Sequence, residues 1–182
     1  MPEYTDIELL AMFRKSEQKH YAFNLLVKKY QKKIYLFARR MVIIHEDADD
    51  IVQNVFIKVW NNLDGFREDA QFFTWLYRIA VNESLSFLKS KQLRTFLSFS
   101  SPEALALNSI RDDNFFNGDE IQTRLRQAII KLPKKQQLVF NMRYFDEMSY
   151  EEMSNVLGTS VGALKASYHF AAKKIEEFIM SN

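Results

Sequence analysis

Apolar side chains recur every three or four positions along most of the chain, and this spacing limits the fold more than any other feature of the sequence. The period is that of one face of an α-helix. Glycine and proline, which interrupt helices, account for only four and three of the 182 residues. The sequence therefore predicts an all-α protein.

Polar and turn-forming residues divide this helical pattern into two blocks. The stretch 93–119 is rich in Ser, Asp and Asn and departs from the helical period. We expect two small helical domains, 1–92 and 120–182, joined by a flexible linker over 93–119. Part of this linker is expected to dock on something, because its apolar residues are many for a free tether: Phe96, Leu97, Phe99, Phe115 and Phe116.

Capping residues and the helical period set the expected helices of the first domain. Thr5 is expected to cap a short first helix, and a second runs from about 16 to 42. Asp47 is expected to cap a third helix over 48–63, and a fourth covers about 71–91. Beyond the linker, helices are predicted over 121–132 and 134–145, with Pro133 in the first turn of the latter.

The C-terminal stretch has the pattern of a helix-turn-helix. Ser149 and Glu152 have the spacing of a capping box at the start of a short helix, which Gly158 ends. Ser160 then caps a longer helix over 161–180. A short helix, a tight turn and a longer helix are typical of one DNA-binding arrangement. The same pattern also occurs in helical proteins that bind no DNA, so spacing alone leaves both interpretations open.

The last helix has one apolar face and one face of small, basic and polar side chains. At 100° per residue the apolar face carries Val161, Leu164, Tyr168, Ala171 and Ile175. Opposite lie Gly162, Ala163, Ala166, His169, Phe170, Lys173 and Lys174, flanked by Lys165 and Ser167. Small residues let a helix approach the major groove closely, and the polar ones could reach bases or phosphates. Lys173, Lys174 and Arg143 suit phosphate contacts. His169 alone is also typical of a surface histidine, and Phe170 could touch a thymine methyl or pack on another domain.

Two groups of side chains in the first domain suggest binding surfaces. Asp47, Asp50, Gln53 and Asn54 form an acidic and amide face for a basic partner. After the turn at Gly65 comes a dense group of rings with two arginines among them: Phe66, Arg67, Phe72, Phe73, Trp75, Tyr77 and Arg78. Aromatic and arginine side chains together can hold an unpaired strand. The alternative is that most of these rings are core and that the acidic face is only solvated.

The stretch that carries these two groups and the C-terminal stretch each resemble a conserved region of a known family. This is the sigma-70 family of RNA polymerase sigma factors, in its extracytoplasmic-function (ECF) group. The string DADDIVQNVFIKVW…FFTWLYRIAVN resembles sigma region 2, and LPKKQQLVFNMRYFDEMSYEEMSNVLGTSVGALKASYHFAAKKI resembles region 4. The resemblance covers most of 20–90 and 121–178, in the family's order. It implies an all-α fold with region 2 at 1–92 and region 4 at 120–182.

The resemblance implies roles for individual residues. Contacts to the clamp helices of the largest polymerase subunit would come from Asp47, Asp50, Ile51, Gln53, Asn54 and Phe56. Recognition and melting of the minus-10 element would involve Phe66, Arg67, Phe72, Trp75, Tyr77, Arg78 and Asn82. One base there would be flipped into a pocket by the loop 65–71. Contacts to the minus-35 element would involve Ser160, Gly162, Ala163, Lys165, Ala166, Ser167, His169, Phe170 and Lys173.

Further partners follow from the same resemblance. Region 4 would rest on the flap of the second-largest subunit, and the linker would thread toward the RNA exit path. An anti-sigma protein is expected to hold the chain inactive, with the two domains packed together in a free or inhibited state. The chain departs from the family at Asn54, where Glu is frequent, and at Ser167, Phe170 and Ala172, where many members carry Arg. Ser86 stands where some members have a second Asn near the minus-10 pocket.

Several other classes of function find no support in the sequence. There is no cysteine, so there is no thiolate metal site or Cys nucleophile. No enzyme motif is present, and His20, His45 and His169 stand far apart in sequence, so we expect no enzyme, cofactor or metal. No signal peptide or membrane span is evident, which predicts a cytoplasmic protein without membrane insertion. The alternative to a sigma factor is a stand-alone helix-turn-helix DNA-binding transcription regulator.

Overall fold

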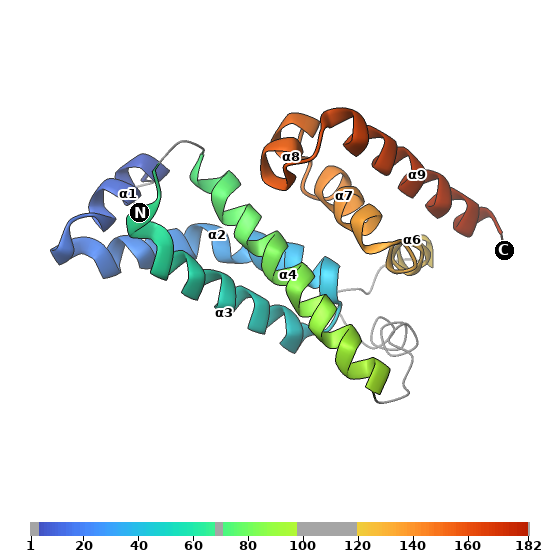
Figure 1. Cartoon of the computed structure of the whole chain (residues 1–182), viewed down its shortest axis with the longest axis horizontal. Coiled ribbons are helices and arrows are strands. Elements are labelled where there is room, and N and C mark those ends of the chain that lie inside the picture. The colour runs from blue at the N-terminus through green and yellow to red at the C-terminus, as the bar shows by residue number, and fades with distance from the viewer. Residues whose placement is uncertain (1–3, 68–70, 98–119, 182) are drawn as a thin grey trace.

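The computed structural model describes residues 4–67, 71–97 and 120–181, and these residues form helices joined by short turns (Figure 1). The predicted all-α class, with one helical domain on each side of the linker, is confirmed. Residues 98–119, which make up most of the expected linker and include Phe99, Phe115 and Phe116, lie outside the described part. So do residues 68–70 of the loop expected to flip a base.

The first domain is built on three long helices that pack side by side. Helix α2 covers Lys19–Val42, α3 covers His45–Asn62 and α4 covers Phe72–Leu97. The short helix α1, Asp6–Phe13, packs against α2. Single 3₁₀ turns at Ser16–Gln18 and Leu63–Gly65 connect these elements. Buried Leu, Ile, Val and Phe side chains from all four helices fill the space between them.

Local capping explains where two of the helices begin. Thr5 accepts a hydrogen bond from the Glu8 backbone N–H, and the Glu8 carboxylate accepts from the Thr5 N–H at 2.7 Å. This reciprocal pair confirms the predicted cap of α1. Ser149 and Glu152 make the same pair at the start of α8, Tyr150–Leu157, as predicted.

The start of α3 differs from the prediction that Asp47 caps it. Helix α2 ends at Val42, the following Ile43 has a positive φ of 70°, and Ile44 is the N-cap of α3. The helix therefore begins at His45, and Asp47 lies inside its first turn. An acidic side chain is favourable there because the unpaired N–H groups at a helix start are positive.

Helix α4 is longer than predicted. It was expected to end near Lys91, but it continues to Leu97, into the first residues of the expected linker. The reason is local, since no Gly or Pro occurs between Leu88 and Leu97 and the apolar and basic residues there are compatible with a helix.

The second domain consists of four helices around a smaller core. Helix α6 covers Glu120–Ile130 and α7 covers Lys134–Tyr144, with Pro133 at the N-cap of α7 rather than inside its first turn. Helix α8 is followed by α9, Val161–Met180. Residues of α6, α7, α9 and the turn between α6 and α7 bury one another in this core: Ala128, Ile129, Leu132, Phe140, Ala171 and Ile175.

The two domains pack directly on each other. Helix α7 contacts α2, and α8 contacts α4, so two helices of the first domain lie against the second (Figure 1). A single set of buried apolar side chains runs across this boundary, and its members from the second domain include Leu138, Met142, Met148, Met153 and Val156. The expectation that the two domains pack together through the linker in a free or inhibited state stays a prediction, because most of that linker lies outside the described residues.

Candidate nucleic-acid interface

The turn before α9 fixes the direction of the last helix. Gly158 has a φ of 63°, and its N–H donates to the Ser154 carbonyl at 2.8 Å, which ends α8. Glycine adopts this left-handed conformation without the steric cost that a Cβ brings. Ser160 then accepts a hydrogen bond from the Ala163 N–H at 3.4 Å and begins α9. Both sequence predictions for this turn are confirmed.

Helix α9 presents its two faces as its period predicts. Leu164, Ala171 and Ile175 are buried, and Val161 and Tyr168 are half-buried. The opposite face is solvent-exposed and carries Gly162, Ala163, Lys165, Ala166, His169, Phe170 and Lys173, with Ser167 half-buried beside it. Its first turns carry almost no side-chain bulk, so the backbone can come close to a flat or grooved partner. Further along, Phe170 is an exposed ring, at 54% of its full area.

The basic residues near this face differ in how they are held. The Lys165 ammonium lies 5.7 Å from the centre of the Tyr150 ring, at the end of α9 nearest the turn. Lys174 instead donates to the Gln136 amide oxygen on α7 at 3.0 Å. Arg143 donates to the Met148 carbonyl at 3.2 Å within the domain, which gives this residue a structural contact as well as its predicted phosphate role.

In the first domain, most rings of the predicted strand-binding group belong to the core. Phe66, Phe72 and Tyr77 are buried, at 8%, 3% and 0% exposure. Trp75 is half-buried, and its ring lies 5.0 Å from that of Phe66 and 5.9 Å from that of Phe72. The polar members Arg67, Arg78 and Asn82 are exposed. In this conformation the buried rings therefore pack below the surface. The surface itself is formed by Trp75 and the polar side chains.

The predicted polymerase-binding face on α3 is likewise part core and part surface. Ile51 and Phe56 are buried in the domain, whereas Asp50, Gln53 and Asn54 are exposed. Asp47 is half-buried and accepts a charge-assisted hydrogen bond from Lys91 of α4. Ile57, which is not among the predicted residues, has a side chain that is 56% exposed. It lies four residues after Gln53 and so on the same helix face, a spacing that was visible in the sequence.

An unexpected polar cluster lies between the domains. The Asp146 carboxylate, only 4% exposed, accepts hydrogen bonds from the Arg40 guanidinium and the Tyr77 hydroxyl. Burial raises the pKa of Asp146, and Arg40, the Tyr77 hydroxyl and Lys33 act in the opposite direction. The pKa of Tyr77 is raised, first by burial and then by the Asp146 charge. No sequence signal marks this cluster, because Arg40 and Asp146 are 106 residues apart.

Arg78 also contacts the second domain. Its Nε donates to the Val156 carbonyl at 3.2 Å, and its Nη2 donates to the Asn155 carbonyl. These two carbonyls belong to the last turn of α8, where a helix exposes unpaired, partly negative oxygens. Two neighbouring residues of the predicted minus-10 surface, Tyr77 and Arg78, are therefore engaged by the chain's own second domain.

Two further searches were made within the described residues. Among them, no group of three or more His, Asp or Glu side chains is arranged to hold a metal ion. None of the helices in the described ranges combines the length and the apolar character needed to cross a membrane.

Comparison with known families assigns both domains. The model of sigma-70 region 2 matches residues 26–94, and the model of sigma-70 region 4 matches residues 122–175. One match lies in each helical domain, in the family's order, and α1 lies outside both. The chain belongs to the sigma-70 family. Its similarity to named ECF members places it in the ECF group of RNA polymerase sigma factors.

The relatives of this sigma factor match it over nearly its whole length. It is 32% identical to the ECF RNA polymerase sigma-E factor of Escherichia coli, over 96% of this chain and 94% of the relative. It is 33% identical to the RNA polymerase sigma-H factor of Pseudomonas aeruginosa, over 86% of this chain and 85% of the relative.

Two solved structures share the arrangement of helices. CnrH, solved in complex with the cytosolic domain of CnrY, matches with a TM-score of 0.70 and 26% identity over 97% of this chain and 98% of CnrH. The sigma factor RpoE of Bartonella quintana, solved with the anti-sigma factor NepR, matches with a TM-score of 0.64 over 86% of this chain and 96% of RpoE. At 18% identity, the second likeness concerns the fold alone.

Proposed function

We propose that this sigma factor binds core RNA polymerase, recognises minus-35 and minus-10 promoter elements and promotes DNA melting for transcription initiation. The observation that carries the proposal is the presence in one sigma-70 chain of two different candidate DNA surfaces. One is the exposed face of α9, with small residues for close approach to a groove. The other is the Trp75 surface of α4, with Arg67, Arg78 and Asn82 around it.

The two surfaces suit different forms of DNA. The α9 face is a convex helix surface with basic and polar side chains, which matches the major groove of a duplex in shape and charge. Trp75 offers a ring face for an unpaired base, and its neighbouring arginines can hold phosphates of a single strand. Asp50, Gln53, Asn54 and Ile57 form a separate surface on α3 for the clamp helices of the polymerase. The flap of the second-largest subunit is the proposed support for region 4.

The stand-alone regulator is the weaker candidate. Such a protein needs only the helix-turn-helix, whereas here the match to region 2 extends from residue 26 to residue 94. Membership of the family also supports a role as a transcription initiation subunit rather than an enzyme. We place its action in the cytoplasm, where core polymerase and chromosomal DNA are found.

An anti-sigma protein is a further proposed partner. Support comes from the two solved neighbours, since RpoE was solved with the anti-sigma factor NepR and CnrH with the cytosolic domain of CnrY. A candidate inhibitor should suppress transcription by this chain and lose that effect when excess core polymerase is added. An inhibitor that bound only the polymerase would contradict this proposal.

The function is tested by run-off transcription with sigma-free core polymerase and a pool of genomic fragments. We expect transcripts from a discrete set of fragments that are absent without the sigma factor. Tight binding to duplex DNA by the chain alone, with no transcripts from any fragment, would instead favour the stand-alone regulator.

A further inference from the structure

Phe170 is an apolar ring on a face of α9 that is otherwise small, polar or basic. The other large apolar side chains between Val161 and Ile175 turn inward, where α9 packs against α6, α7 and α8. Leu164 and Ile175 are buried there, and Val161 and Tyr168 are half-buried. A single exposed ring needs no explanation by itself. What gives Phe170 a role is the set of groups that surrounds it.

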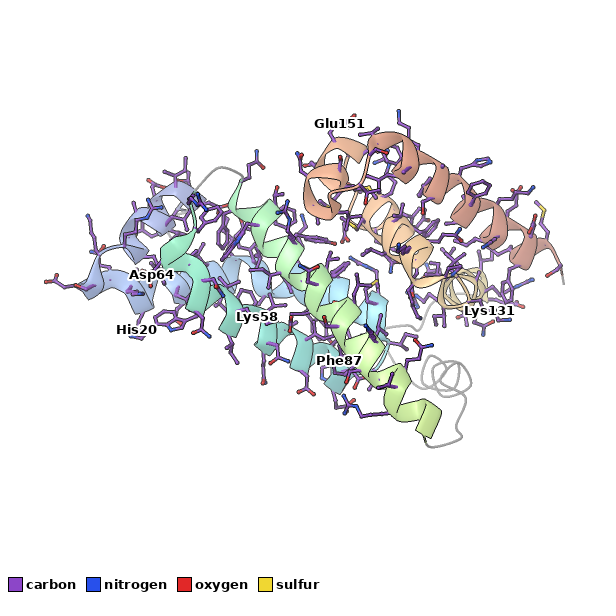
Figure 2. All side chains as sticks on the ribbon, viewed as in Figure 1. His20, Lys58, Asp64, Phe87, Lys131 and Glu151 are labelled. Carbon is purple, nitrogen blue, oxygen red and sulfur yellow. The ribbon has the colours of Figure 1, made fainter. Side chains whose placement is uncertain are left out.

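The side chains next to Phe170 leave its ring accessible. On a helix surface the neighbours of a residue stand three and four positions away, and helical side chains lean toward the N-terminus. The ring therefore leans over Ser167 and Ala166, which are too small to cover it. The ring of His169 lies beside it, with 5.9 Å between the centres. Figure 2 shows α9 along the upper edge of the second domain, whereas Lys131 lies at the lower edge, beside α6.

The charges along α9 favour an anionic partner at Phe170. The helix carries no carboxylate from residue 161 to residue 175, and its first acidic side chains are Glu176 and Glu177. Lys173 is exposed and stands three residues after Phe170, so a cation lies next to the ring on the helix surface. A ring with this neighbour suits a DNA groove, in which phosphates flank the apolar and polar edges of the bases.

A phenylalanine ring can recognise one feature of the major groove. It has no hydrogen-bond donor or acceptor, so it cannot bind the polar groups that distinguish guanine, adenine and cytosine. Thymine alone presents an apolar group in that groove, its C5 methyl group. Contact between the ring and the methyl group removes both from water, which is favourable.

We propose that Phe170 is a specificity-determining residue, which recognises one thymine of the minus-35 element by contact of its ring with the C5 methyl group. This inference rests on the proposed function, because it takes α9 as the helix that enters the major groove. It adds the base, and the chemical group on that base, that one residue recognises. Lys173, on the same face, binds a phosphate without regard to sequence.

The methyl group can be removed alone, because uracil is thymine without it. Bound duplexes are first selected from a random pool, once by the chain with core polymerase and once by the chain alone. Each thymine of the enriched upstream element is then replaced singly by uracil, and the affinity for each duplex is measured. We expect one thymine at which uracil lowers the affinity of wild type about threefold to fivefold, the loss expected for one buried methyl group.

Substitutions on the exposed face separate the methyl contact from other losses. Phe170→Ala removes the ring, so it should bind the thymine and uracil duplexes equally. Phe170→Leu keeps an apolar side chain and should retain part of the preference for thymine. Lys173→Ala is the matched control, because it should weaken binding to both duplexes by the same factor and leave their ratio as in wild type. Both residues are exposed, and circular dichroism verifies that each variant is folded.

The inference is overturned if no thymine loses affinity for wild type when its methyl group is removed. It is also overturned if Phe170→Ala keeps the full preference for thymine, because another side chain, such as Ala163 or Ala166, would then contact the methyl group. An equal loss for both duplexes in Phe170→Ala would likewise exclude the methyl contact.

Failure of the proposed function gives different results. If no duplex is enriched in either selection, α9 recognises no sequence, and both the proposed function and the role of Phe170 are contradicted. If duplexes are enriched by the chain alone and none supports transcription with polymerase, only the proposed function fails, and the uracil series still decides the role of Phe170.

Discussion

The two candidate DNA surfaces of this sigma factor are presented very differently. Nine residues are assigned to the minus-35 element. All of them are exposed except Ser167, which is half-buried. On α4, Tyr77 is buried and Arg78 is bonded to α8. One surface is thus ready to meet duplex DNA, and the other is partly occupied by the chain itself.

This difference follows from what each surface is expected to bind. A duplex groove is rigid and already formed, so a rigid exposed helix can read it without rearrangement. An unpaired strand exists only after the duplex has opened, and a surface of rings and arginines exposed beforehand would attract any single strand. In this structure the second domain is bonded to Tyr77 and Arg78 of that surface.

Loss of the Trp75 ring is expected to have the largest effect on transcription. Stacking of a base on an aromatic side chain contributes about 1–3 kcal/mol, so Trp75→Ala should lower run-off yield about 5- to 150-fold. Trp75→Phe keeps a ring face and should retain more activity. Circular dichroism is needed beside the run-off assay, because Trp75 also packs on Phe66 and Phe72. Equal activity of both variants would remove the stacking role.

On the exposed surface, two lysines of α9 provide a matched pair. Lys165 lies at the end of α9 nearest the turn, whereas Lys174 is held by Gln136 of α7. We expect Lys165→Ala to weaken binding of the polymerase complex to promoter duplex about tenfold, by loss of one specific base or phosphate contact. Lys174→Ala, with the same charge change, should weaken it less. Equal losses in gel-shift titrations would mean that only net charge matters.

Alanine substitutions at two glycines near the turn should change the free energy of unfolding in opposite directions. Neither Gly158 nor Gly162 has an atom within 4 Å of the position where a Cβ would stand, but only Gly158 has a positive φ. Gly158→Ala should therefore lower the free energy of unfolding by about 1 kcal/mol through backbone strain. Gly162→Ala should raise it by roughly 0.5–1 kcal/mol through helix propensity. Urea unfolding measures both, and the same sign for both variants would contradict the turn geometry.

The smallest expected effect concerns the capping box of α8. Hydrogen bonds from the Ser149 backbone and hydroxyl lower the pKa of Glu152 from its ordinary value of 4.5. Because the folded pKa lies below the unfolded one, this contribution to stability is present above pH 4.5 and is lost as the pH falls through the folded pKa. Ser149→Ala should move the pKa of Glu152 back toward 4.5 in an NMR titration. An unchanged pKa would exclude the hydroxyl as a cause.

Local signals in the sequence predicted much of the fold. The starts of α1, α8 and α9 follow from a cap within three residues, and the two faces of α9 follow from the helical period. The start of α3 was missed because Ile43 turns the chain at a φ of 70°, which is rare for a β-branched residue and has no sequence signature. The predicted end of α4 was too early because residues 93–97 were assigned to the linker together with the polar stretch that follows them.

The residues of the candidate site could be predicted from the sequence, but whether each side chain is exposed or buried could not. Phe66 and Phe72 could equally have been surface or core rings, since a ring on an amphipathic helix suits both, and only the packing decides. The contacts of Asp146 join residues more than sixty positions apart, so no pattern in a single sequence could indicate them. Long-range contacts of this kind determine which candidate DNA surface is exposed in the structure.

The central claim is that upstream recognition and DNA opening belong to separate surfaces. Permanganate reactivity of unpaired thymines on a promoter found by run-off transcription tests it most directly. With saturating polymerase complex, Trp75→Ala should occupy the promoter but leave its thymines unreactive, whereas Lys165→Ala should open every promoter that it occupies. Normal opening by Trp75→Ala, or closed promoters occupied by Lys165→Ala, would contradict this division between α4 and α9.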